Sequence, residues 1–176
     1  MNDKNKIINK GDNNNIYTGN TIMINELSKK SDSITRLIQF LSDNLKNDDS
    51  IDNIHRISET ENKMDENDLP SELREEIRSN YGVIKTTFED AFLNFNEKKI
   101  LNWINSYYRE SLKSCSSSIE IWEYVNKEVY NYVIVHNADN LIDDFEAKYP
   151  IRSLLIYAFV KCKLLKNPEE NNNDIK

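Results

Sequence analysis

The chain of 176 residues has only three glycines, three prolines, two cysteines and two histidines. So few turn-forming residues indicate a mainly helical protein. Neither a GxxxxGK[ST] nor a GxGxxG phosphate-binding motif occurs, so we expect no cofactor of those classes. Cys115 and Cys162 lie far apart and form no CxxC motif, which indicates reduced thiols.

The sequence has no long apolar run. The longest, LLIYAFV, falls well short of the roughly 20 residues that cross a bilayer, and the first residues lack the apolar segment of a signal peptide. We therefore expect a cytoplasmic protein with no membrane partner. Apolar residues make up 38% of the chain and aromatic residues 10%, enough for a modest core.

Positive charge is in short supply. The chain has 23 Lys and Arg against 30 Asp and Glu, a net charge of −7, and no cluster of basic residues. Nucleic-acid binding depends on neutralising phosphates with Lys and Arg. This composition therefore disfavours a nucleic-acid partner, and we expect none.

The first 25 residues carry two short β-type runs, NIYT and TIMIN, separated by the turn-forming pair Gly19-Asn20. They predict an N-terminal β-ribbon. A lone two-stranded ribbon is marginally stable in water, so this ribbon should pack on its own helices, on a second copy or on another protein. The apolar residues that we expect to act in assembly are Ile16, Tyr17, Ile22 and Ile24.

Residues 26–46 show the apolar spacing of an amphipathic helix. Leu27, Ile34 and Leu41 are seven residues apart, as in a coiled-coil seam. Two interpretations remain open: the helix pairs with a second copy through this seam, or it lies on the body of its own chain.

Residues 47–68 are acidic and polar, and we interpret them as a linker. Residues 69–167 then predict a bundle of about five helices, with a break or kink near Ser79–Gly82 and an N-cap at Ser117 or Ser118. Residues 168–176 form a frayed tail. The predicted fold is thus mainly α: a short β-ribbon, a long amphipathic helix and a helical bundle.

The search for catalytic chemistry centres on His136. It is followed by Asp139, Asp143 and Asp144, and this pattern could bind a divalent metal. A histidine at a helix C-terminus is equally explained by the helix dipole. No nucleophile lies beside a base in the sequence, so we expect a protein that is not an enzyme and has no metal site.

Four aromatic residues could form a platform in the bundle domain: Trp103, Tyr107, Tyr108 and Trp122. Without interleaved Lys and Arg, a platform for nucleic-acid bases is disfavoured. We expect these side chains to act either in docking a protein partner or in the core.

Two long stretches of the bundle, NYGVIKTTFEDAFLNFNEKKILNWINSYY and YPIRSLLIYAFVKCKLLKNP, carry a family resemblance. Together they resemble the C-terminal helical domain of bacterial ABC-three-component conflict systems. The opening KGDNNNIYTGNTIMI is similar to short strand segments that precede domains in bacterial defence proteins. The resemblance covers about half of the chain and rests mainly on Tyr149, Pro150, Leu155, Tyr157, Ala158, Phe159, Lys161, Cys162 and Leu165.

In those systems a small helical domain accompanies an SMC-like ABC ATPase and an effector. The protease, nuclease or membrane segment of an effector is missing from this sequence. The resemblance therefore implies an accessory or adaptor subunit of an antiviral or anti-plasmid defence complex, with the ATPase and an effector as partners. The alternative is a small effector hydrolase or nuclease that uses a divalent metal near His136 and Asp139.

Overall fold

The computed structural model describes residues 19–46, 60–137, 147–161 and 164–166, with the side chains of residues 19–28 excepted. These residues form a helical bundle, which confirms the mainly α prediction. The helices are α1 (Gly19–Asn44), α2 (Thr60–Glu66), α3 (Ser71–Phe92), α4 (Glu97–Ser111), α5 (Ser118–His136) and α6 (Lys148–Val160).

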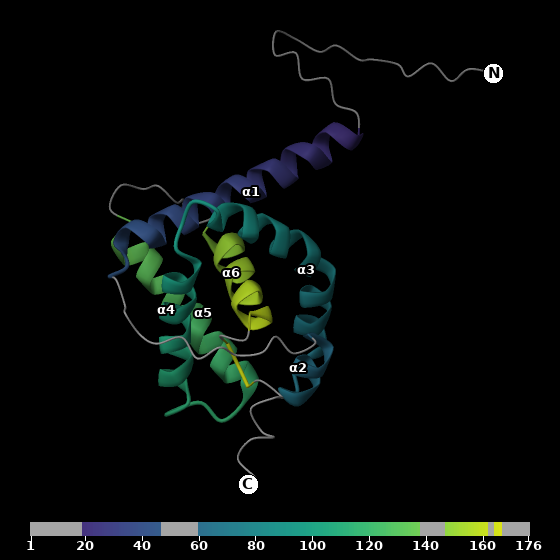
Figure 1. Cartoon of the computed structure of the whole chain (residues 1–176). Helices are drawn as coiled ribbons and strands as arrows, with labels where there is room; N and C mark the ends of the chain where they lie inside the picture. Colours follow the sequence, from purple (N-terminus) through teal and green to yellow (C-terminus); the bar gives the residue numbers. More distant parts are fainter. Residues whose placement is uncertain (1–18, 47–59, 138–146, 162–163, 167–176) are drawn as a thin grey trace, which may run out of the picture.

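Helix α6 is the centre of the bundle and contacts α1, α3, α4 and α5 (Figure 1). From Pro150 to Val160 every residue except Arg152 is buried. A helix that is apolar around its whole circumference has to be enclosed by other helices. This explains why the most apolar stretch of the sequence became the core.

Helix α1 belongs to the bundle and crosses α3, α4 and α6. Its buried residues follow the 3–4 spacing of one helix face: Ile34, Leu37, Ile38, Phe40, Leu41 and Leu45. Of the predicted heptad seam, Ile34 and Leu41 are therefore core residues. The interpretation of a helix lying on its own chain's body describes this part of α1.

The segment predicted as an acidic linker, residues 47–68, contains a packed helix. In α2 the side chains of Lys63 and Met64 are buried. The Lys63 ammonium donates to the Phe159 carbonyl at 2.6 Å, where the last turn of α6 leaves carbonyl groups without helical partners. A buried cation needs such acceptors. Because this acceptor lies on α6, far away in the sequence, the residue pattern of α2 alone does not predict that Lys63 is buried.

Asn67 completes the clamp between α2 and the end of α6. Its amide nitrogen donates to the Lys63 and Lys166 carbonyls at 2.8 and 2.9 Å, and its amide oxygen accepts from the Lys166 backbone N–H at 3.0 Å. Because the two bonds to Lys166 link residues 99 positions apart, they hold the end of α2 against the segment that follows α6.

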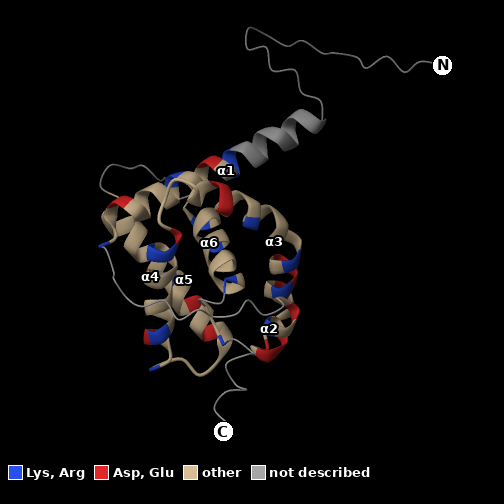
Figure 2. Cartoon of the chain, viewed as in Figure 1, with Lys and Arg blue, Asp and Glu red and all other residues tan. Residues whose placement is uncertain are grey.

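Ion pairs join α2 to the beginning of α3, where Figure 2 shows acidic and basic residues side by side. Arg78 holds Glu61 with two hydrogen bonds of 2.9 and 2.7 Å, and Arg74 pairs with Asp65. The hydrogen bonds between these two side chains raise the pKa of the Arg78 guanidinium and lower the pKa of the Glu61 carboxyl. The acidic composition of this segment thus serves partly in contacts to α3.

The predicted break near Ser79–Gly82 is wrong, because α3 runs unbroken through Gly82. Gly82 is exposed and a Cβ there would meet no atom within 4 Å, so nothing at this position demands glycine. Of the two predicted N-caps, Ser117 is the cap of α5: its hydroxyl accepts from the Glu120 N–H at 3.3 Å. Asn96 caps α4 in the same way, at 3.0 Å.

The N-terminal β-ribbon is not confirmed. Its first run, with Ile16 and Tyr17, lies outside the described residues, while residues 21–25 of its second run lie in α1. Residues 138–146 of the predicted bundle lie outside the described residues, and the tail at 168–176 lies outside them entirely. Among the described helices, none has the length and apolar character needed to cross a membrane.

Candidate interaction site

The structure separates the four predicted platform residues into two groups. Trp122 of α5 is fully buried and its ring lies against Phe159 of α6, with 6.3 Å between the ring centroids. Trp103, Tyr107 and Tyr108 of α4 are only partly buried. Trp122 is therefore a core residue, and the other three remain candidates for contact with a partner.

Trp103 is the middle of a continuous aromatic cluster on α4 and α5. Its ring packs against Tyr107 on the same helix at 5.3 Å and against Tyr132 of α5 at 4.9 Å, both in edge-to-face geometry. The Tyr132 ring in turn stacks on the His136 imidazole at 4.1 Å. Such ring pairs contribute stabilising free energy in addition to that of the area they bury. The rings of the cluster therefore hold one another in place before any partner binds.

An open groove of about 470 Å³ lies beside this cluster, where the end of α1 meets α4 and α5. Its volume falls within the roughly 300–1,000 Å³ typical of ligand pockets. The lining residues are Asn44, Leu45, Lys46, Lys99, Trp103, Ser106, Tyr132 and His136. We call this cavity the α1–α4–α5 groove. Among the described residues that line it, two are lysines and none is a carboxylate.

Two long side chains fix the end of α1 in this place. The Lys99 ammonium donates to the Ser42 carbonyl at 2.8 Å, and the Tyr132 hydroxyl donates to the Asn44 carbonyl at 3.2 Å. Both carbonyls belong to the last turn of α1, which has no further helical donors to satisfy them. Most of the lining residues therefore lie on three helices that contact one another, and Leu45 and Lys46 follow directly after α1.

Burial raises the pKa values of the Tyr107 and Tyr132 hydroxyls, and a hydrogen bond from Trp103 partly opposes this at Tyr107. Both hydroxyls therefore stay protonated at neutral pH. The exposed His136 places Nδ1 at 2.9 Å from the Tyr132 carbonyl. Because a carbonyl only accepts, Nδ1 carries the proton and Nε2 is the atom that a ligand would meet.

Trp103 and Tyr107 were predicted together as parts of a platform and His136 separately as a metal ligand, and the structure joins all three through ring contacts. Sequence analysis missed Tyr132, which connects them. The signal was its position four residues before His136, on the same helix face. Tyr108 lies on α4 and packs against the core.

The remaining predicted interaction residues belong to the N-terminal part. Ile34 and Leu41 are buried within the bundle, so they offer no surface to a partner. Ile22, Ile24 and Leu27 lie in α1 among the residues whose side chains are not described. Ile16 and Tyr17 lie outside the described residues.

The alternative metal site rests on Asp139, Asp143 and Asp144, which lie outside the described residues. Within the part of the chain that the structure describes, no group of three His, Cys, Asp or Glu side chains could hold a metal ion. His136 is therefore placed in the groove, and its proposed carboxylate partners are not placed.

Comparison with known proteins adds no identity: no family model, curated protein or solved structure matches the chain.

Proposed function

We propose that this chain is a non-enzymatic interaction subunit that binds a partner protein in the α1–α4–α5 groove. The observation that carries the proposal is the cluster of Trp103, Tyr107 and Tyr132, partly buried beside an open cavity. Tryptophan and tyrosine in well-packed surroundings supply most of the binding energy of protein interfaces. An apolar or aromatic side chain of the partner would enter the groove and contact Trp103.

The resemblance of the bundle to the helical domain of ABC-three-component systems supports a particular partner. In this proposal the partner is an SMC-like ABC ATPase, the chain is an accessory subunit of a bacterial defence complex, and the effector is a third protein. The N-terminal segment with Ile16, Tyr17, Ile22 and Ile24 serves as a second assembly element, toward a partner or a second copy.

The test is co-expression of the tagged chain with its neighbouring gene products, followed by light scattering of the purified complex. We expect a stoichiometric complex with an SMC-like ATPase. Trp103→Ala should weaken it by about 30-fold, equivalent to ~2 kcal/mol. A monomer that captures no ATPase would contradict the adaptor function.

Trp103 also packs against the core, so a blocking variant is needed that leaves this ring in place. Ser106 is exposed at the groove, and Ser106→Tyr should fill the cavity and abolish ATPase binding. Ser79 is exposed on α3 and serves as the matched control, since Ser79→Tyr adds the same side chain elsewhere. Equal binding by both variants would show that the groove is not the interface.

The rival function, a metal-dependent effector enzyme, has one favourable feature: the exposed His136 lines a cavity, and its Nε2 has no role in the bond to the Tyr132 carbonyl. It predicts binding of Mn²⁺ or Zn²⁺ and loss of hydrolytic or nuclease activity in His136→Ala. The adaptor function predicts that this variant still assembles with the ATPase. Calorimetry with the metal and the assembly assay distinguish the two functions.

A further inference from the structure

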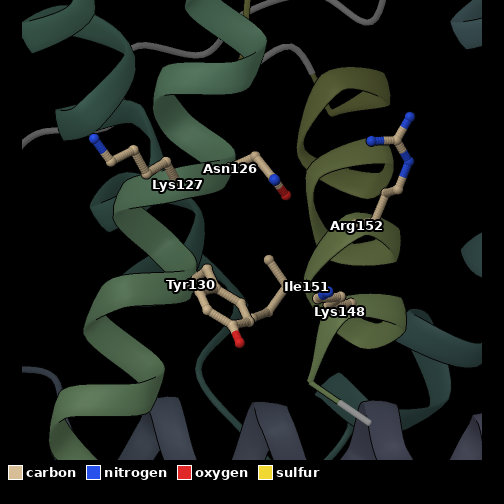
Figure 3. Close-up of a pocket in the computed structure, with 6 residues that line it drawn as sticks. All are labelled: Asn126, Lys127, Tyr130, Lys148, Ile151 and Arg152. Atoms are coloured by element: carbon tan, nitrogen blue, oxygen red, sulfur yellow. The ribbon is translucent and has the colours of Figure 1, made fainter. Parts of the chain in front are cut away.

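A second hollow lies between α5 and α6, away from the aromatic cluster (Figure 3). It has a volume of about 370 Å³ and is open to solvent. The residues that line it are Asn126, Lys127, Tyr130, Lys148, Ile151 and Arg152. We call it the α5–α6 pocket. Neither the groove nor the proposed function makes use of it.

The accessible part of the pocket's floor is the half-buried ring of Tyr130, because Ile151 beneath it is only 1% exposed. Figure 3 shows the side chains of Tyr130 and Ile151 approaching each other across the gap between the helices. It also shows the Asn126 amide extending from α5 toward α6. An amide offers two N–H donors and a carbonyl acceptor. That combination suits a peptide backbone, which presents the complementary groups.

Three basic side chains surround the floor, and none of the described residues that line the pocket is a carboxylate. Lys127 and Lys148 have no ion-pair partner among the described residues. Arg152 is held by Glu76 of α3 through its Nε and Nη2 atoms at 2.5 and 2.6 Å. This pair fixes the guanidinium in place while its Nη1 donors remain for a ligand. Glu76 and Glu123 both act electrostatically on Arg152, so Lys127 and Lys148 supply most of the uncompensated positive charge at the pocket.

The cations do not converge on one point. In Figure 3 the Lys127 ammonium extends to one side of the gap, and the Arg152 guanidinium extends to the other side. A compact anion such as a single phosphate could not meet both. An extended ligand that crosses from α5 to α6 could place a negative charge near each.

We propose that the α5–α6 pocket binds an extended acidic segment of a partner protein, with an apolar side chain on the Tyr130–Ile151 floor. Carboxylates before and after this anchor pair with Lys127 on one side and with Lys148 and Arg152 on the other. The Asn126 amide bonds the segment's backbone. Charge complementarity selects the partner and speeds its association.

The test is fluorescence anisotropy of the full chain with a labelled peptide, acetyl-Glu-Asp-Leu-Asp-Glu-amide. We expect saturable binding that weakens as salt is added. A peptide with Gln and Asn in place of the acids, or with Ala in place of Leu, should bind about tenfold more weakly or worse. No saturable binding at millimolar concentration, or equal binding of the amide peptide, would overturn the proposal.

Variants locate the binding. Lys127 and Lys148 are exposed, so Lys127→Glu combined with Lys148→Glu should fold and lose the peptide. Exposed Lys113 and Lys98 supply the control, because reversing both changes the net charge equally. Ser106→Tyr blocks only the groove and should leave peptide binding intact, which separates failure here from failure of the proposed function. If the pocket binds AMP but not the peptide, the proposal of an acidic protein segment is wrong and the pocket's ligand is a small molecule.

Discussion

Helices α5 and α6 pack against each other and are both rich in apolar and aromatic residues, yet they meet solvent in different ways. In α6 nearly every side chain after Tyr149 is buried. In α5 a single stripe is buried, namely Ile121, Trp122, Val125, Val129 and Val133. Its tyrosines Tyr124, Tyr130 and Tyr132 are only partly covered. Composition alone therefore does not distinguish a core helix from a helix that offers binding surface.

The difference follows from the number of neighbours. Helix α6 has helices around it, so its aromatic rings fill the core: Tyr157 stacks on Phe88 at 4.9 Å and Phe159 meets Trp122. The α1–α4–α5 groove and the α5–α6 pocket both lie along α5, at Tyr132 and at Tyr130. Apolar surface that the bundle does not need for its own core is where we expect partners to bind.

The largest expected effect contrasts one ring from each helix. Phe159→Ala should lower the free energy of unfolding by about 3–5 kcal/mol, because it removes a fully buried ring. Tyr132→Ala should cost about 1–2 kcal/mol, since its ring pairs are partly exposed. Urea denaturation of both variants measures the difference. Equal losses would mean that α5 contributes as much to the core as α6.

The next effect concerns the clamp at the end of α6. Asn67→Ala removes three hydrogen bonds of a buried side chain, two of which join α2 to the end of α6, and should cost about 2 kcal/mol. Asn94 is exposed, and Asn94→Ala is the matched control with little expected change. If Asn67→Ala has no effect in urea denaturation, the 60–67 segment is a linker after all, as its sequence predicted.

A smaller effect appears at alkaline pH. Burial, and then a hydrogen bond to Glu97 at 2.7 Å, raise the pKa of the Tyr157 hydroxyl far above its ordinary value. The folded chain therefore holds this proton more tightly than the unfolded chain. The resulting stability is fully present below pH ~10 and is lost as the pH rises further.

Tyr157→Phe should accordingly cost about 1 kcal/mol at neutral pH and make stability fall less steeply above pH ~10. Tyr132→Phe should change that slope less, because Tyr132 is more exposed and donates to a carbonyl instead of a carboxylate. Urea denaturation across this pH range provides both slopes. A larger change in Tyr132→Phe would reverse the assignment of core and surface.

Sequence analysis predicted a helical bundle over residues 69–167 and, as one of two candidates, the N-cap of α5 at Ser117, because the helices there have apolar faces and α5 begins at a serine cap. It missed α2 because the burial of Lys63 depends on carbonyls of α6, a contact made only in the folded chain. For the same reason it named Trp103 and His136 but could not join them, since Tyr132 connects them only where α4 crosses α5. Local sequence patterns therefore predict individual helices, whereas the candidate binding sites depend on contacts between helices that are distant in the sequence.

Gly82 supplies the smallest effect and tests the one local pattern that misled. Glycine inside a helix is about 0.5–1 kcal/mol less favourable than alanine, because the unfolded chain is freer there. A Cβ at Gly82 would meet no atom within 4 Å, so Gly82→Ala should raise the free energy of unfolding by that amount. Ser79→Gly, at an exposed position of the same helix, should lower it comparably. If Gly82→Ala instead destabilises the chain, α3 bends at Gly82 in solution, and its two halves pack on α6 as separate helices.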